Sequence, residues 1–171
     1  MKTLIMLAGV PGSGKSTFAK EYAKTHPNTF VVDTDEVRKK VMGSYHLFPK
    51  DRRILYDEMI REGNAFLASQ KGDCTLIEDS TFTDNFRRKY YMERLLGYDR
   101  SVLYMMKFHD YSICYQRNKQ RIKDKWVPDE VITNFIKTYE EPTPEVAALF
   151  DEVKEVYGDK ESRQKGLKKV K

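Results

Sequence analysis

A nine-residue segment near the start of the chain has the residue types and spacing that hold a polyphosphate: Gly-Val-Pro-Gly-Ser-Gly-Lys-Ser-Thr over residues 9–17. It matches the P-loop pattern, in which glycines allow a tight turn and bring backbone N–H groups close to phosphate oxygens. In this pattern Lys15 reaches the β- and γ-phosphates of a nucleotide, and the Ser16 hydroxyl binds Mg²⁺. The candidate nucleotide-binding residues are Gly9, Gly12, Ser13, Gly14, Lys15, Ser16 and Thr17.

The segments on either side of this loop have the patterns that a P-loop requires. An apolar run over residues 4–8 predicts a buried strand, and residues 17–24 predict a helix. A glycine-rich turn that merely joins a strand to a helix is the alternative interpretation. Because the glycines, the lysine and the serine are all in register, nucleotide binding is the leading hypothesis.

A carboxylate and a guanidinium follow the second predicted strand, residues 29–32. If a helix begins at Asp35, then Asp35 and Arg38 are three residues apart and face the same way. A phosphoryl acceptor needs a carboxylate that positions its hydroxyl and takes the proton, so Asp35 is the candidate general base. Arg38 is the candidate for a two-pronged contact with a phosphate or carboxylate of the acceptor. The alternative is an acidic helix cap followed by an exposed arginine.

The third predicted strand, residues 75–77, runs into the carboxylates of Glu78 and Asp79. Neighbouring side chains of a strand point to opposite faces, so we expect one carboxylate at the site and the other facing away from it. Asp79 is the candidate for the Mg²⁺ shell, together with Ser16. A carboxylate at an ordinary strand-to-turn junction is the alternative.

Two further pairs of arginines could bring positive charge to a phosphoryl group. Arg117 and Arg121 are four residues apart, which places them on one helical face. Arginines on a mobile segment can neutralise charge that develops during phosphoryl transfer, and the segment before Pro128 is a plausible hinge for such a lid. Arg87 and Arg88 lie in another predicted helix, where at least one is expected to be a solvated charge. A basic, exposed helix is the alternative for the first pair.

Length and composition bound the class of protein. With 171 residues and a formal net charge of +5, the chain fits one domain and suits an anionic ligand without demonstrating nucleic-acid binding. Cys74 and Cys114 have apolar neighbours and are predicted to be reduced core residues, and the histidines lack metal-ligand spacing. The sequence has no leader-like segment before Leu4 and no apolar run long enough to span a bilayer. A cytoplasmic protein with no membrane partner is therefore expected.

Apolar or β-branched runs alternate with helical patterns, which is typical of an α/β fold with a parallel sheet. Strands are predicted over residues 4–8, 29–32, 75–77, 102–108 and 152–157, and helices over 51–70, 84–96, 111–122 and from 128 onward. Ligands bind at the carboxyl ends of the strands in such sheets, and the candidate residues fall there. The Lys-rich segment over 158–171 is predicted to be a basic tail, with a nucleic-acid-binding arm as the alternative.

The motifs at residues 9–17, 33–38, 77–81 and 117–121 together resemble the P-loop kinases related to the kinase module of phage-type polynucleotide 5′-hydroxyl kinase. The resemblance covers about residues 2–157. It implies a P-loop NTPase three-layer α/β sandwich with a central parallel sheet of adenylate-kinase type and an arginine-bearing helical lid over about residues 114–128. Nothing resembles the phosphatase module of some relatives, so no 3′-phosphatase activity is expected.

The same resemblance implies roles for individual side chains. On the donor side, Lys15 and Ser16 would hold ATP and Mg²⁺. On the acceptor side, Asp35 would deprotonate the 5′-hydroxyl and Arg38 would contact the acceptor phosphate. In the lid, Arg117 or Arg121 would contact the donor phosphates, and Asn118 would also lie at the nucleotide.

These observations predict an ATP-dependent kinase domain over residues 1–157, with the 5′ end of a nucleic acid as the favoured acceptor. Two alternatives stay open: a P-loop kinase of a nucleoside, sugar, aminoacylated species or nucleotide-sugar, and an ATP-binding regulatory protein that transfers no phosphate. The acceptor groove is expected from residues 41–53 and 82–91, which carry no diagnostic motif. The sequence does not distinguish DNA from RNA or ATP from GTP, and it does not determine the oligomeric state.

Overall fold

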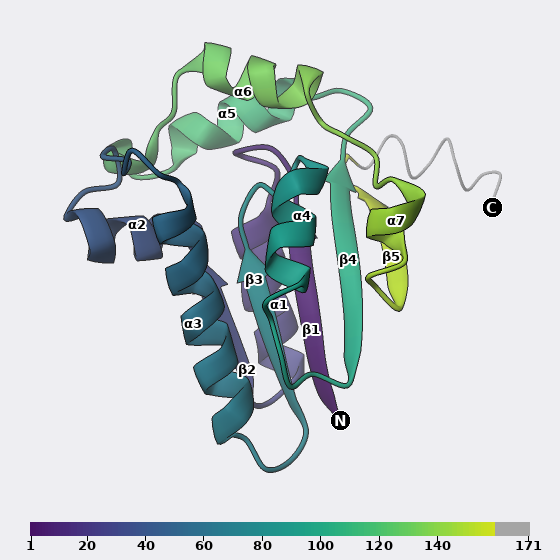
Figure 1. Cartoon of the computed structure of the whole chain (residues 1–171). Coiled ribbons are helices and arrows are strands. Elements are labelled where there is room, and N and C mark those ends of the chain that lie inside the picture. Colours follow the sequence, from purple (N-terminus) through teal and green to yellow (C-terminus); the bar gives the residue numbers. More distant parts are fainter. Residues whose placement is uncertain (160–171) are drawn as a thin grey trace, which may run out of the picture.

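A five-stranded, all-parallel sheet forms the centre of the computed structural model, which describes residues 1–159 (Figure 1). The strand order is β2-β3-β1-β4-β5, so that β1 lies in the middle. Because the strands are parallel, their carboxyl ends meet at one edge of the sheet. The strands are β1 (Lys2–Ala8), β2 (Thr29–Asp33), β3 (Cys74–Asp79), β4 (Arg100–Lys107) and β5 (Glu152–Tyr157).

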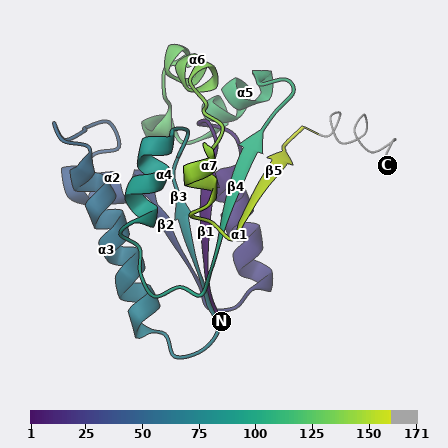
Figure 2. The ribbon, with the colours of Figure 1, turned by 45° about the vertical axis from the view of Figure 1, so that its right-hand side comes forward.

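Helices cover both faces of the sheet and complete three layers, as Figures 1 and 2 show. On one face α1 (Lys15–Thr25) packs through Ala19 against Ile5, Leu7 and Ile77. The opposite face carries the larger apolar core, beneath α3 (Arg53–Ser69), α4 (Asn85–Met92) and the short α7 (Pro144–Ala147). This arrangement confirms the predicted α/β fold with a parallel sheet.

The remaining helices lie at the carboxyl ends of the strands (Figure 1). They are α2 (Thr34–Met42), α5 (Ser112–Gln120), the 3₁₀ helix η1 (Lys123–Lys125) and α6 (Asp129–Lys137). A small apolar cluster joins α5 and α6 to the sheet, with Val10, Phe108 and Cys114 at its centre. The elements that follow the strands are therefore held over the edge where ligands bind in such folds.

Most predicted elements are present, with boundaries shifted by a few residues. The helix expected over residues 84–96 ends at Met92, before a turn that includes Gly97 at φ 87°. Pro128 precedes α6 as its N-cap, whereas the sequence placed it in the first turn. Cys74 and Cys114 are buried free thiols, as predicted. Residues 160–171, which form most of the predicted basic tail, lie outside the described residues.

Two charged residues are buried in the layers away from the strand ends. Glu78 has no exposed surface and faces α3, where a Cβ added to Gly63 would meet its carboxylate at 2.5 Å. Burial raises the pKa of Glu78 well above its usual value, so we expect a neutral side chain. Arg88 is also fully buried and donates to the carbonyl of Phe82 at 2.8 Å. Arg87 is only 13% exposed in its side chain, so the expectation of a solvated arginine in this pair was wrong.

None of the helices in residues 1–159 is both long enough and apolar enough to cross a lipid bilayer.

Candidate nucleotide and acceptor site

The P-loop connects the end of β1 to the start of α1, at the middle of the sheet edge. Gly12 and Gly14 have φ values of +80° and +94°, in the left-handed region that favours glycine. A Cβ at Gly12 would lie 2.2 Å from the carbonyl oxygen of Cys114, because the loop packs directly against α5. The loop is thus fixed both by its own turns and by contact with the lid helix.

The polar groups of the P-loop suit an oxygen-rich anion. The Lys15 ammonium donates to the carbonyl oxygens of Gly9 and Val10, at 3.1 and 3.3 Å. Burial lowers the pKa of Lys15, and the nearby Asp79 carboxylate opposes that effect. The Ser13 hydroxyl is buried and has no hydrogen-bond partner in the described part of the chain. A phosphate in the loop would supply an acceptor for these donors.

Ser16 and Asp79 form the pair that could take part in a metal shell. The Ser16 hydroxyl donates to Oδ2 of Asp79 at 3.1 Å. Burial raises the pKa of Asp79 to about 6, although the positive Lys15 acts in the other direction. No group of three or more Asp, Glu, His or Cys within residues 1–159 could hold a metal without help. Mg²⁺ commonly uses one or two protein ligands plus substrate phosphates, so this pair fits Mg²⁺ bound together with a nucleotide.

The raised pKa of Asp79 predicts that Mg²⁺-dependent nucleotide binding weakens in mild acid. Asp79 must be ionised to bind Mg²⁺, and its ionised fraction falls as the pH drops through about 6. The Mg²⁺-dependent part of ADP affinity should fall about fourfold between about pH 7.5 and about pH 5.5. Calorimetric titration with and without Mg²⁺ would measure it. Asp79→Asn should remove most of this pH dependence; an equal slope in that variant would show that another group titrates.

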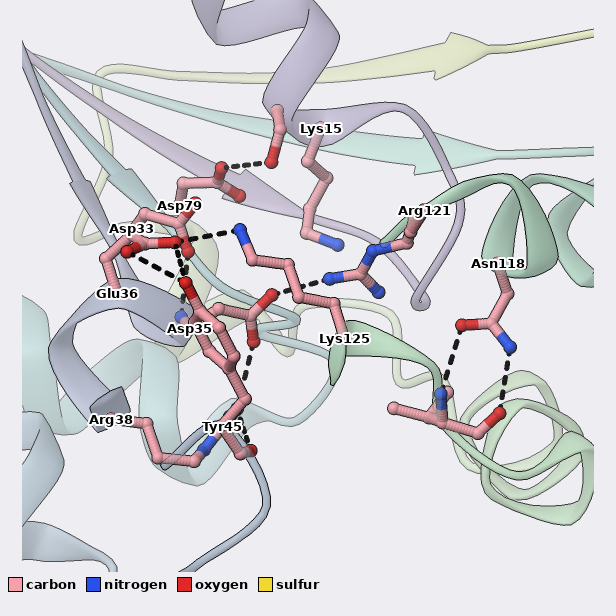
Figure 3. A network of polar contacts seen from close by, with 12 residues as sticks. Lys15, Asp33, Asp35, Glu36, Arg38, Tyr45, Asp79, Asn118, Arg121 and Lys125 are labelled. Carbon is pink, nitrogen blue, oxygen red and sulfur yellow. Dashed lines mark hydrogen bonds and ion pairs between the residues drawn. The ribbon is translucent and has the colours of Figure 1, made fainter. Parts of the chain in front are cut away.

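Asp35 lies in the first turn of α2, at the carboxyl end of β2. The helix cap is Asp33, whose carboxylate accepts from the backbone N–H of Asp35 at 2.8 Å. The alternative interpretation of Asp35 as the cap is therefore wrong, and its carboxylate is available for other contacts. Arg38 Nη1 donates to Oδ1 of Asp35 at 3.0 Å, and Arg121 Nη2 donates to Oδ2 at 2.6 Å (Figure 3). A residue of α2 and a residue of the lid thus hold the two oxygens of one carboxylate.

The lid residues separate into different roles. The predicted helix ends at Gln120, so Arg117 and Arg121 do not share a helical face. Nη1 of Arg117 lies 3.3 Å from the position of a Cβ on Gly14, beside the P-loop, whereas Arg121 reaches Asp35. Asn118 is fully buried, and its amide bonds both backbone polar groups of Val127, at 2.8 and 3.1 Å. The sequence placed Asn118 at the nucleotide, and this expectation was wrong. Its amide instead joins α5 to the segment before α6.

A cavity of about 750 Å³ connects the P-loop to a second wall beyond Asp35. On that wall the guanidinium carbons of Arg38 and Arg52 lie 4.4 and 4.2 Å from the centre of the Phe48 ring. Arg87 contributes a third guanidinium and donates to the hydroxyl of Thr81. Phe48 and Arg52 lie within residues 41–53, where the sequence placed the acceptor groove, but no motif or periodicity singled them out, because both follow α2 in an irregular connection. The remaining side chains of this wall are Tyr45, His46, Leu55 and Tyr56.

The sheet is parallel, with a P-loop after its central strand β1, acidic side chains at the carboxyl ends of β2 and β3, and a basic lid. This combination defines a P-loop protein with the kinase fold. The chain belongs to the AAA_33 family, described as an AAA domain, whose family profile matches residues 4–142.

Individual relatives share parts of this chain at low identity. The L-seryl-tRNA(Sec) kinase of Methanococcus maripaludis is 27% identical over an alignment of 145 residues that covers 81% of this chain and 53% of that protein. The chain thus spans about half the length of this curated relative. The structure of a gluconokinase from Sinorhizobium meliloti has 19% identity and a TM-score of 0.59, covering 92% of this chain and 83% of the other. A fungal RNA kinase has 17% identity and a TM-score of 0.60, covering 93% and 75%.

Proposed function

We propose that this protein is a cytoplasmic, Mg²⁺-dependent kinase that transfers the γ-phosphoryl group of ATP to a 5′-hydroxyl of a polynucleotide. The observation that carries the proposal is the position of Asp35. Its carboxylate lies in the cavity that links the P-loop to a wall of arginines and aromatic rings, between Arg38 of α2 and Arg121 of the lid. A protein that only binds a nucleotide has no need of a carboxylate on the far side of the phosphates.

On the donor side, the chain's own groups bind and orient the nucleotide. Lys15 and the P-loop N–H groups hold the β- and γ-phosphates, and Arg117 lies beside the loop to neutralise charge on the donor. Ser16 and Asp79 would hold Mg²⁺, which neutralises charge between the β- and γ-phosphates when it is bound.

On the acceptor side, Asp35 accepts the proton of the attacking hydroxyl. The hydroxyl oxygen forms a bond to the γ-phosphorus in line, the bond from that phosphorus to the β–γ bridging oxygen breaks, and ADP leaves. In this proposal Arg121 exchanges Oδ2 of Asp35 for a phosphate oxygen, which leaves that carboxylate oxygen free to face the hydroxyl. Arg121 would then stabilise the charge that develops during transfer.

The character of the second wall supports an acceptor that carries its own negative charge. Arg52 has no carboxylate partner among residues 1–159, and its guanidinium lines the cavity beside that of Arg38, on the Phe48 ring. Phosphodiester groups next to a 5′-hydroxyl can form charge-assisted hydrogen bonds with these guanidinium groups, whereas an uncharged sugar supplies no negative charge to neutralise them. The names of two relatives, a seryl-tRNA kinase and an RNA kinase, also favour this class of acceptor.

The decisive experiment compares acceptors in one assay. The protein is incubated with γ-labelled ATP and Mg²⁺ and with single-stranded RNA or DNA that has a 5′-hydroxyl. Parallel reactions contain nucleosides, gluconate and other sugars. We expect label on the 5′ end of the oligonucleotides, and no label when that end already carries a phosphate.

Other results would replace the proposal. Label on small molecules alone would make the protein a metabolite kinase, the class to which the structurally similar gluconokinase belongs. Release of labelled phosphate without any acceptor would indicate an ATPase. Nucleotide binding without turnover would favour the regulatory alternative.

A further inference from the structure

A second ion pair connects the lid to α2, one helical position away from Asp35. Nζ of Lys125, in η1, lies 2.8 Å from Oε2 of Glu36 (Figure 3). The Lys125 side chain is 22% exposed although it carries a charge, so it is largely enclosed by its neighbours. Glu36 directly follows Asp35, and Lys125 lies four residues after Arg121. The lid and α2 are thus joined by two parallel ion pairs, of which only one includes the candidate base.

Tyr45 ties this second pair to the acceptor wall. Its hydroxyl donates to the Glu36 carboxylate, 3.0 and 3.2 Å from the two oxygens. The ammonium of Lys125 lies 5.0 Å from the centre of the Tyr45 ring, and Arg38 donates to the Tyr45 carbonyl at 3.1 Å. The lid, α2 and the segment that leads to Phe48 therefore all contact one residue, Tyr45.

We infer that Glu36, Lys125 and Tyr45 are positioning residues that hold the lid against α2 and align the acceptor wall while Arg121 moves from Asp35 to the phosphate. The physical reason is that the Arg121–Asp35 pair breaks during the proposed transfer, so it cannot also be what keeps the lid in place. The Lys125–Glu36 pair touches neither reacting group and can persist throughout the reaction. The catalytic part of this inference rests on the proposed function.

The only tryptophan of the chain allows the lid to be followed directly. Trp126 directly follows Lys125 and lines the cavity, and its indole N–H donates to the carbonyl of Arg121 at 2.9 Å. When the lid lifts, its ring should become more accessible to a soluble quencher. Acrylamide quenching therefore measures lid position in the full chain, without any acceptor.

The test compares Lys125→Gln, Glu36→Gln and Tyr45→Phe with the double charge swap Glu36→Lys/Lys125→Glu. Lys123→Gln is the matched control, because Lys123 lies in the same turn, is exposed and has no ion-pair partner within residues 1–159. We expect Lys125→Gln and Glu36→Gln to raise the quenching constant of Trp126 and to raise the KM of the acceptor about fivefold. Tyr45→Phe should raise the acceptor KM with little effect on quenching, since the ion pair remains. The value of kcat should stay within about twofold in all of them.

Rescue separates positioning from general damage to the fold. The charge swap should restore the quenching constant to within about twofold of the unmodified protein, but KM only in part, because the Tyr45 hydroxyl loses its acceptor on residue 36. Single variants that behave like Lys123→Gln, or a swap that rescues neither readout, would overturn the inference. If no polynucleotide is phosphorylated, the proposed function fails, but the quenching data still decide whether the ion pair holds the lid.

Discussion

Replacing Asp35 with asparagine is expected to lower kcat about 10²- to 10⁴-fold while ATP affinity changes less than about threefold. The amide keeps the shape of the side chain and can still accept a hydrogen bond from Arg38 or Arg121. It cannot take up the proton of the attacking hydroxyl. Single-turnover transfer to a 5′-hydroxyl oligonucleotide, together with ATP titration in the absence of acceptor, would measure the two quantities separately.

The control for this variant is Asp73→Asn, an exposed carboxylate next to the start of β3, at the opposite end of the sheet from the cavity. It should leave transfer unchanged. Unaltered kcat in Asp35→Asn would remove Asp35 as the base. An equal loss of ATP affinity would instead mean that Asp35 acts through the lid and the donor phosphates.

Replacing Lys15 with alanine is expected to impair both nucleotide binding and transfer. Its ammonium is held at the inner side of the P-loop by two backbone carbonyls, where it would meet the β- and γ-phosphates. Removal of one preorganised charge from such a site lowers kcat by about 10²- to 10³-fold, and ATP affinity should fall at least about tenfold. Calorimetry with ATP and Mg²⁺ and the transfer assay measure the two effects.

Lys20→Ala provides the matched control, because Lys20 lies five residues further along, on the exposed surface of α1. It should bind and transfer like the unmodified protein. Normal ATP affinity and rate in Lys15→Ala would contradict the assignment of the P-loop as the nucleotide site.

Local sequence determined the donor half of the site. The P-loop could be predicted from the chain alone, because all of its signals lie within a few residues of one another. These signals are the glycine spacing, the lysine and hydroxyl in register, the apolar strand before the loop and the helix after it. The same holds for the alternation of strands and helices and for the choice between Glu78 and Asp79. Strand alternation sends one carboxylate into the core and the other toward Ser16, as the structure shows.

Helical spacing was less informative where an element ends early. Arg117 and Arg121 have the spacing of one helical face, but α5 ends at Gln120 and the two guanidinium groups reach different parts of the site. Asn118 lies within the same motif and is used entirely to hold Val127. No periodicity reveals such a contact, because it depends on where the chain returns after the helix.

The acceptor half was decided by the tertiary structure. Arg121 and Asp35 are 86 residues apart, yet they share a hydrogen bond at 2.6 Å. Arg52 and Arg38 meet at the Phe48 ring from different segments, and Lys125 meets Glu36 across the cavity. The sequence by itself determined that a phosphate-binding loop and a parallel sheet are present, because those features follow from short-range sterics and patterning. Which side chains face each other across the cavity depends on how the lid and the connection after α2 pack over the strand ends, and that is set by long-range contacts.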